Sequence, residues 1–223
     1  MKKRGITNIQ GAIFDLDGTI LDSCWVWRKV DQDFLGKRGL QVPSDYAQNI
    51  ISLTFEEAAQ YTIDRFSLPE EKQDVMREWN QMAWKEYAEK VPLKPGTKEL
   101  LEWFRDHEIP VGVATSNTSL LFEPCLKRHG IYELFHSFTE IQEVKRGKEF
   151  PDIYIKEAGK LGCSPEHCVV FEDIIPALKS ASGGGFITVG VVEDTWQYRM
   201  DEFAESCDFQ IHQIYEALTL LNS

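Results

Sequence analysis

Positive charge is scarce in this sequence. Its 24 lysines and arginines stand against 36 aspartates and glutamates, which gives a formal net charge of −12 at pH 7. Because nucleic acids and anionic membrane surfaces are bound by clustered lysines and arginines, this balance argues against both partners. An anionic substrate would have to be held by a local cation and a few cationic side chains, against the field of the whole chain.

Paired cysteines, long apolar runs and internal repeats are also missing. The five cysteines form no Cys-x-x-Cys pair and their number is odd, which favours reduced thiols in a cytoplasmic protein. The basic start Met1-Lys2-Lys3-Arg4 is not followed by a long apolar stretch, so neither a signal peptide nor a membrane span is expected. The 223 residues, 43% of them hydrophobic, suffice for one large domain with an inserted element, or for two domains.

A short apolar run near the start ends at two aspartates. Residues 12–14 have the continuous apolar character of a strand that is covered on both faces. In a strand the side chains of Asp15 and Asp17 point the same way, and Gly18 allows a sharp turn just beyond them. The sequence therefore predicts two carboxylates at the carboxyl end of a strand, where open α/β sheets bind their ligands.

Two carboxylates so close together repel each other unless a cation or a shared proton offsets their charge. Oxygen ligands of this kind suit Mg²⁺, whose shell is completed by water and by phosphate oxygens. Aspartate is also a nucleophile for phosphoryl groups, giving an acyl phosphate. The same residues equally suit an ordinary turn at a strand end.

The rest of the chain divides into a helical segment followed by alternating helices and strands. From Cys24 to about Lys90 the apolar residues keep helical spacing. Within this segment, Ser67 and Glu70 have the spacing of a capping box, which predicts a long helix starting there. Beyond residue 92 helices and strands alternate, which implies a parallel sheet with a site along the carboxyl ends of its strands. Pro124 predicts a late or irregular start for the helix beyond it.

Polar residues follow two more strands of this second region and one of its loops. The strand over residues 110–114 runs into Thr115-Ser116-Asn117, and the strand over 168–171 ends in Glu172-Asp173. Between them, Lys148 lies three residues before Pro151-Asp152, close to the alternative cations Lys145 and Arg146. Taken singly, these groups also suit a helix cap, an acidic first turn and a solvated loop.

Together with Asp15-Leu16-Asp17-Gly18-Thr19, these three groups make four short motifs. The four motifs resemble the signatures of the haloacid dehalogenase (HAD) superfamily and occur in the same order along the chain. The β-phosphoglucomutase-like and phosphoglycolate phosphatase-like subgroup is the most similar. The resemblance implies an α/β fold with a HAD-like Rossmannoid parallel-sheet core, residues 1–22 and 92–223, and an inserted α-helical cap domain, residues 23–91.

The resemblance also assigns roles to the residues of these four motifs. Asp15 would be the nucleophile, and Asp17 would protonate the leaving alkoxide and then take a proton from water. The Asp15 carboxylate, the Asp17 backbone carbonyl and Asp173 would hold Mg²⁺, with Glu172 as an outer partner. The remaining residues would bind the transferring phosphate: Thr115, Ser116 and Lys148.

These roles predict a Mg-dependent phosphatase that hydrolyses a small phosphate monoester through an aspartyl phosphate. We expect a cytoplasmic monomer or weak dimer whose partner is a small phosphorylated metabolite. The dehalogenases of this superfamily do not keep the second acid, so Asp17 argues against carbon–halogen cleavage.

Two alternatives remain open at this stage. A β-phosphoglucomutase-like mutase would carry a cap arginine and a cap histidine where this sequence has Thr54 or Phe55 and Trp27. Aromatic residues at these positions favour a less polar leaving group or a smaller ester. A non-catalytic scaffold that binds a phosphometabolite is the alternative of another class.

Overall fold

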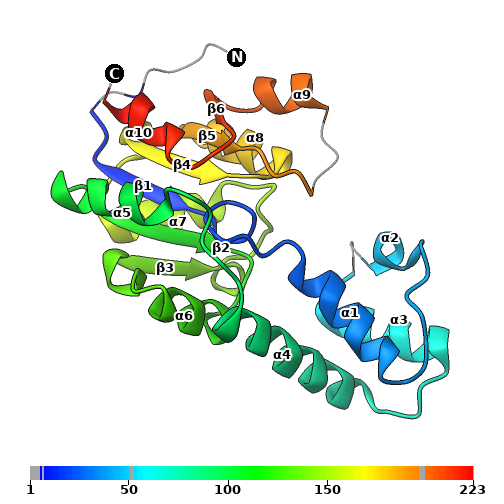
Figure 1. Cartoon of the computed structure of the whole chain (residues 1–223). Helices are drawn as coiled ribbons and strands as arrows, with labels where there is room; N and C mark the ends of the chain where they lie inside the picture. Colours follow the sequence, from blue (N-terminus) through cyan, green and yellow to red (C-terminus); the bar gives the residue numbers. More distant parts are fainter. Residues whose placement is uncertain (1–5, 7, 51–52, 196–198, 223) are drawn as a thin grey trace. The chain divides into compact units, whose positions relative to one another are not determined.

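Six parallel strands form one sheet in this computed structural model, which describes residues 6, 8–50, 53–195 and 199–222 (Figure 1). Across the described sheet the strand order is β3-β2-β1-β4-β5-β6. The strands are β1 (Gly11–Phe14), β2 (Val111–Thr115), β3 (Ser137–Glu140), β4 (Cys168–Glu172), β5 (Ile187–Val191) and β6 (Phe209–Ile211). The predicted α/β fold with a parallel sheet is confirmed.

Helices connect these strands or follow the last one. They are α5 (Thr97–Asp106), α6 (Ser119–Arg128), α7 (Asp152–Leu161), α8 (Ile175–Gly183), α9 (Met200–Glu205) and α10 (Glu216–Leu221), with 3₁₀ turns at η1 (Tyr132–Leu134), η2 (Ile141–Glu143) and η3 (Pro165–His167). None of the described helices combines the length and the apolar character needed to cross a membrane.

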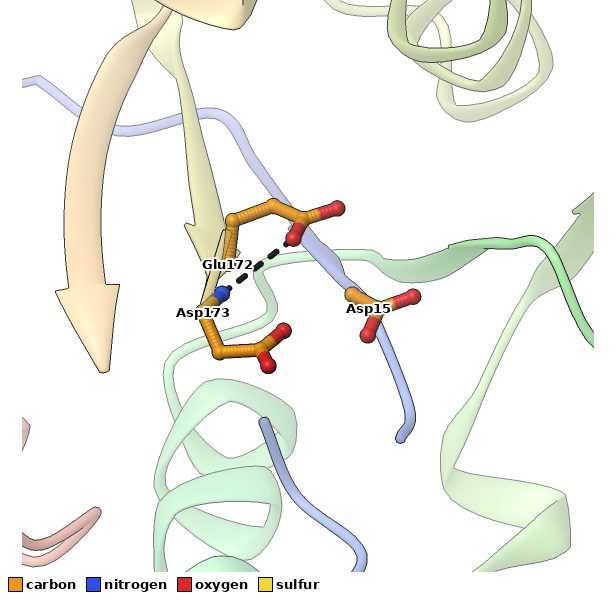
Figure 2. A group of neighbouring side chains, drawn as sticks. All are labelled: Asp15, Glu172 and Asp173. Carbon is orange, nitrogen blue, oxygen red and sulfur yellow. Dashed lines mark hydrogen bonds between the residues drawn. The ribbon is translucent and has the colours of Figure 1, made fainter. Parts of the chain in front are cut away.

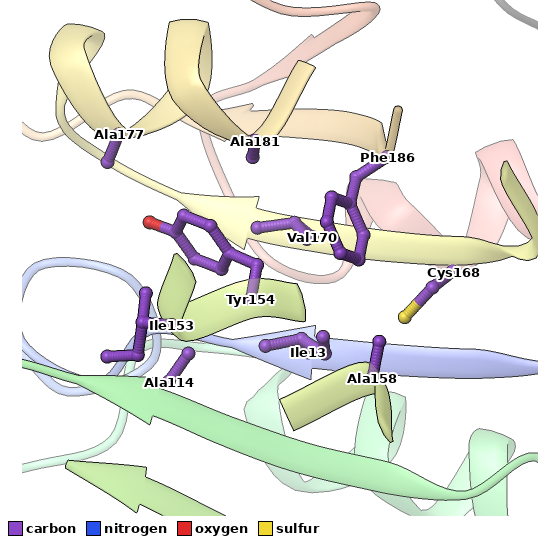
Figure 3. Packing of buried hydrophobic residues seen from close by; sticks show 10 residues of the cluster. All are labelled: Ile13, Ala114, Ile153, Tyr154, Ala158, Cys168, Val170, Ala177, Ala181 and Phe186. Atoms are coloured by element: carbon purple, nitrogen blue, oxygen red, sulfur yellow. The ribbon is translucent and has the colours of Figure 1, made fainter. Parts of the chain in front are cut away.

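Both faces of the sheet are covered, as the apolar strands require. On the Ile13 face, α7 and α8 close over the sheet, and their side chains form one core with residues of β1, β2 and β4 (Figure 3). On the opposite face Phe14 stacks on Phe171 with ring centroids 4.4 Å apart, and Phe104 of α5 meets Phe14 edge-on at 6.0 Å. Period-two alternation along β1 therefore anchors both helical layers.

The central strand β1 lies between β2 and β4, where the direction of the connections changes. The chain runs outward from β1 to β2 and β3, and then crosses back to β4 and continues to β5 and β6. Phe14 is in register with Val113 on one side and with Phe171 on the other. The carboxyl ends of β1 and β4 therefore lie side by side at the switch point, where such sheets bind ligands.

Residues 24–90 form a second compact unit, which interrupts the first unit of residues 1–23 and 91–223. Its helices are α1 (Val26–Gly36), α2 (Tyr46–Ile50), α3 (Phe55–Phe66) and α4 (Lys72–Glu89). Its core is aromatic: Trp79 of α4 meets Phe34 of α1 at 5.5 Å and Phe55 of α3 at 5.6 Å between ring centroids. We call residues 24–90 the helical unit.

The predicted helix start at Ser67 is wrong. Ser67 has left-handed backbone angles, φ 51° and ψ 46°, and its N–H donates to the Ile63 carbonyl, so it ends α3. A residue that caps a helix start has extended backbone angles that aim its side chain at the first turn. Thr54 has that geometry and forms a capping box with Glu57, while α4 begins at Lys72.

The helix expected beyond Pro124 starts before it. α6 begins at Ser119 and keeps Pro124 inside it. A proline in a helix removes one hydrogen bond to the carbonyl four residues before it, here that of Leu120. Leu120 is 58% exposed, so this part of the helix faces water, which can hydrate a carbonyl that has lost its donor.

Candidate active site

Three buried carboxylates meet at the carboxyl ends of β1 and β4 (Figure 2). Asp15 directly follows β1, and its N–H donates to the Phe171 carbonyl of β4 at 3.0 Å. This places Asp15 beside Glu172 and Asp173. One carboxylate oxygen from each of the three residues lies within 4.8 Å of the others. We call this group the acidic cluster.

Lys148 brings an ammonium into the acidic cluster. Its Nζ donates to Asp15 Oδ1 and, at 2.5 Å, to Glu172 Oε1. The loop that carries Lys148 is attached to α8, because the Ser180 hydroxyl of α8 donates to the Lys148 carbonyl. The alternative cations Lys145 and Arg146 are exposed, and Arg146 pairs with Asp152 at 2.6 Å.

Glu172 accepts three hydrogen bonds from the protein itself. Besides Lys148, the Tyr154 hydroxyl of α7 donates to Oε1 at 2.7 Å, and the Asp173 N–H donates to Oε2 at 3.2 Å. Burial and the Glu172 carboxylate keep the pKa of the Tyr154 phenol well above its usual value, so Tyr154 stays a donor. Glu172 therefore serves to hold Lys148 in place.

The charge of the acidic cluster is not balanced by Lys148 alone. Burial raises the pKa of Asp15 well above its usual value; Lys148 opposes this shift, while Glu172, Asp173 and Asp17 add to it. Burial by itself would lower the pKa of Lys148, but Asp15 and Glu172 raise it, so the ammonium keeps its charge. Three carboxylates against one ammonium leave an excess of negative charge on oxygen donors, and this set fits Mg²⁺.

The Asp17 side chain is held by partners outside the acidic cluster. The Ser23 hydroxyl donates to Asp17 Oδ1 at 2.5 Å, and the Asn117 side-chain amide donates to Oδ2 at 2.8 Å. Asp17 is only half-buried, whereas Asp15 is buried. The two acids of the first motif therefore have different surroundings, as two different chemical roles require.

Thr115 and Ser116 differ in burial. Thr115 ends β2 and is fully buried, and its Oγ1 accepts the Asn117 N–H at 3.0 Å. Ser116 is exposed and lies outside the buried group. The turn that follows is closed by Asn117, whose side-chain oxygen accepts the Thr118 N–H at 2.7 Å.

Sequence reasoning missed the residues that hold the site residues in place: Thr19, Ser23, Asn117, Tyr154 and Ser180. The Thr19 hydroxyl donates to Asp173 Oδ1 at 3.2 Å. Thr19 and Asn117 stand inside the motifs, so their position was a usable signal. Tyr154 and Ser180 come from α7 and α8 and carry no local signal, because only the packing of those helices brings them to the site.

A model of the family described as Haloacid dehalogenase-like hydrolase matches residues 12–191 of this chain. The chain belongs to this family. The match spans all four motifs, from Asp15 to Asp173, and confirms the resemblance inferred from them.

Two curated relatives match most of the chain. Fructose-1-phosphate phosphatase YqaB of Escherichia coli (strain K12) is 31% identical in an alignment of 188 residues, and the match covers 81% of this chain and 95% of that protein. Probable pseudouridine-5'-phosphatase of Drosophila melanogaster is 26% identical in an alignment of 210 residues, and the match covers 86% of this chain and 85% of that protein. Both are named phosphatases, and the predicted enzyme class, a phosphoric monoester hydrolase of the HAD family, is confirmed.

A solved structure agrees with the fold. The crystal structure of a putative beta-phosphoglucomutase from Thermotoga maritima superposes with a TM-score of 0.80 at 22% identity, covering 96% of this chain and 97% of that one. At this identity the likeness supports the fold and carries no statement about the reaction.

Proposed function

We propose that this chain is a Mg-dependent phosphatase that hydrolyses small phosphorylated sugars or related monoesters through an aspartyl phosphate. The observation that carries the proposal is the buried cluster in which Asp15 meets Lys148, Glu172 and Asp173. A carboxylate nucleophile, a fixed ammonium and further acids for a cation are the parts that phosphoryl transfer needs.

In the first half-reaction Asp15 attacks phosphorus in line with the leaving oxygen. A bond forms between the Asp15 carboxylate and phosphorus, and the ester bond between phosphorus and the alcohol oxygen breaks. Asp17 gives its proton to the departing alkoxide as general acid. The Ser23 and Asn117 hydrogen bonds orient the Asp17 carboxyl group for this transfer.

In the second half-reaction water replaces Asp15 on phosphorus. Asp17, now ionised, takes a proton from the attacking water; the bond between phosphorus and the Asp15 oxygen breaks, and inorganic phosphate leaves. One carboxyl group thus acts as acid and then as base, and both aspartates return to their starting state.

Lys148 and Thr115 are the proposed phosphate ligands, with Ser116 beside them. The Lys148 ammonium is fixed between two carboxylates and can donate to a phosphoryl oxygen as well, because it has three protons. Bound Mg²⁺, with Asp15, Asp173 and the Asp17 backbone carbonyl as the residues to hold it, would neutralise charge on the phosphoryl oxygens.

The substrate class follows from the relatives and stays part of the proposal. The names of the two curated phosphatases specify phosphate monoesters of a sugar and of a nucleoside. We propose that the helical unit acts as the cap that selects among such esters, and that the enzyme is a monomer or weak dimer.

The mutase alternative is not favoured. The Escherichia coli and Drosophila melanogaster relatives are named phosphatases, and the positions that differ from the mutase pattern have structural tasks. Thr54 caps α3, and Phe55 packs edge-on against Trp27 at 5.7 Å between ring centroids. The scaffold alternative has no observation that favours it.

The decisive experiment measures inorganic phosphate release from a panel of sugar phosphates and nucleotides, with Mg²⁺ and with chelator. We expect Mg-dependent release by the wild type and a loss of at least about 10³-fold in kcat for Asp15→Asn, because the nucleophile is removed. Asp106→Asn is the matched control: it makes the same change at an exposed residue at the end of α5, and it should keep full activity.

Three outcomes would contradict the proposal. Release that persists in Asp15→Asn would show that another group is the nucleophile. Tight binding of an ester without turnover would favour the scaffold. Transfer of phosphate to another hydroxyl of the sugar, with little free phosphate, would favour the mutase.

A further inference from the structure

A cavity in the helical unit shares no lining residue with the acidic cluster. It has a volume of about 250 Å³ and is formed by α1 and α4, which pack side by side (Figure 1). We call it the α1–α4 groove. Its lining residues are Lys29, Val30, Asp33, Lys37, Met82, Lys85, Glu86 and Lys90.

The groove concentrates positive charge in a chain that has little of it. Four of the five lysines in residues 24–90 line it, and the fifth, Lys72, pairs with Glu56 elsewhere. Only two acids share the lining, so the groove carries an excess of two positive charges while the whole chain carries −12. The lysines gather here although the unit as a whole has more acids than bases.

Both acids of the lining are already engaged by lysines. Asp33 accepts from Lys29 at 2.7 Å, and Glu86 Oε1 accepts from Lys90 at 2.9 Å. Lys37 reaches Glu78 at 3.1 Å, and Lys85 has no ion pair among the described residues. The groove therefore does not suit a cation, and Lys85 remains available to an anion.

Glu86 adds a second, independent requirement on the chemistry of a ligand in the groove. The residue is 6% exposed, and its Oε2 atom is buried without a hydrogen-bond partner in the described structure. A buried acceptor that lacks a donor is costly, so a ligand group that donates a hydrogen bond would be favoured here. Hydroxyl groups on the ligand meet this requirement.

We propose that the α1–α4 groove is a second ligand site, which binds a small phosphate-bearing anion with hydroxyl groups. The lysine ammoniums take the phosphate, and a hydroxyl donates to Glu86. Val30 and Met82 supply an apolar floor for the carbon chain. The volume accommodates a small metabolite and not a peptide or a nucleic acid. This proposal does not rest on the phosphatase function, because none of its residues belongs to the acidic cluster.

The test follows the acetylation rate of each lysine by mass spectrometry in the full chain. The probes are inorganic phosphate and, with chelator present, fructose 1-phosphate, compared with sodium chloride at equal ionic strength. We expect the probes to slow acetylation of all four groove lysines at least about threefold and to leave Lys72 unchanged. Fructose 1-phosphate should act at lower concentration than phosphate, because its sugar hydroxyls can donate to Glu86 while its phosphate stays on the lysines.

Variants separate the site from general charge effects. In Lys37→Gln/Lys85→Gln, protection of Lys29 and Lys90 should need about tenfold more probe, since two charged donors are lost. Lys72→Gln removes the same kind of charge outside the groove and should change nothing. Thermal unfolding of each variant checks that the helical unit is folded.

The results that overturn this proposal differ from those that overturn the phosphatase. Protection of Lys148 alone would show anion binding at the acidic cluster and none in the groove. Equal protection of Lys72 would reduce the effect to ionic screening, as would equal protection by sodium chloride. Absence of protection at every lysine would exclude the site. Loss of phosphatase activity in every assay would leave the groove result standing.

Discussion

One ion-pair group in the first unit (residues 1–23 and 91–223, called the α/β unit below) and one in the helical unit use charged side chains in opposite ways. In the α/β unit, the Lys148 side chain is 7% exposed and is shared by two buried carboxylates. In the helical unit, Lys29 and Asp33 form an ion pair whose side chains are 37% and 45% exposed. Buried charges are expensive to leave unpaired and hold one geometry, whereas exposed pairs contribute little and can exchange partners. The first arrangement suits chemistry, and the second suits reversible binding.

The largest effect on stability should come from breaking the buried ion pairs. We expect Lys148→Met to lower the free energy of unfolding by about 3–5 kcal/mol, because Asp15 and Glu172 would be left buried without their ammonium. Lys29→Met removes an exposed pair and should cost about 0–1 kcal/mol. Denaturant unfolding of the two variants makes the comparison, and similar losses in both would refute it.

The next largest difference in stability between the two units should come from substituting one glycine in each. A methyl group at Gly112 of β2 would collide with the buried Glu157 carboxylate, which accepts hydrogen bonds from Ser137 and from Thr139. We expect Gly112→Ala to cost about 2–4 kcal/mol, since Glu157 must move and lose its donors.

The matched change in the helical unit should have the opposite sign. Gly36, at the end of α1, has open space where a methyl group would be placed. Gly36→Ala should therefore be neutral or stabilise by up to about 1 kcal/mol, because alanine loses less backbone freedom on folding. Thermal unfolding measures both variants, and a loss in Gly36→Ala as large as that in Gly112→Ala would contradict this reasoning.

The smallest expected effect is a pH dependence in the helical unit. Burial raises the pKa of Asp31 from 3.8 to about 7. Because the folded value is the higher one, the stability that Asp31 contributes is present below pH 3.8 and is lost as the pH rises through about 7.

Asp31→Asn removes this titration. The free energy of unfolding of this variant should therefore rise relative to that of the wild type between pH 4 and pH 8. The rise should be on the order of 1 kcal/mol, because solvent screens the partly exposed carboxylate. Unfolding at a series of pH values tests this, with Asp33→Asn on the exposed side of α1 as the control. Parallel pH profiles for the wild type and Asp31→Asn would show that Asp31 is not desolvated.

Much of the fold was predictable because strands and helices differ in the period of their apolar residues. The runs at 12–14, 110–114 and 168–171 became β1, β2 and β4, and each ends where its polar residues begin. Helix boundaries were less predictable. Ser67 and Glu70 have the spacing of a capping box, but spacing does not reveal that Ser67 adopts left-handed backbone angles and ends α3.

The candidate site was predictable to the extent that its residues sit at strand ends. Asp15, Glu172 and Asp173 meet as expected, because parallel strands bring their carboxyl ends to one edge. Position in a charged loop does not separate Lys148 from Lys145 and Arg146, and only its spacing to Pro151-Asp152, through the family resemblance, singled it out. The hydrogen bond from Ser180 to the Lys148 carbonyl turns that residue inward, and it comes from a helix 32 residues away.

The sequence by itself determined that two acids end a central strand, that further acids end a second strand, and that a helical segment interrupts the sheet. These features depend on side-chain periodicity and on glycine, which act within a few residues of the chain. Only the tertiary structure decided that Lys148 lies between Asp15 and Glu172, that Tyr154 holds Glu172, and that four lysines gather along one groove. Those outcomes depend on how whole helices pack, because packing joins residues that are distant along the chain.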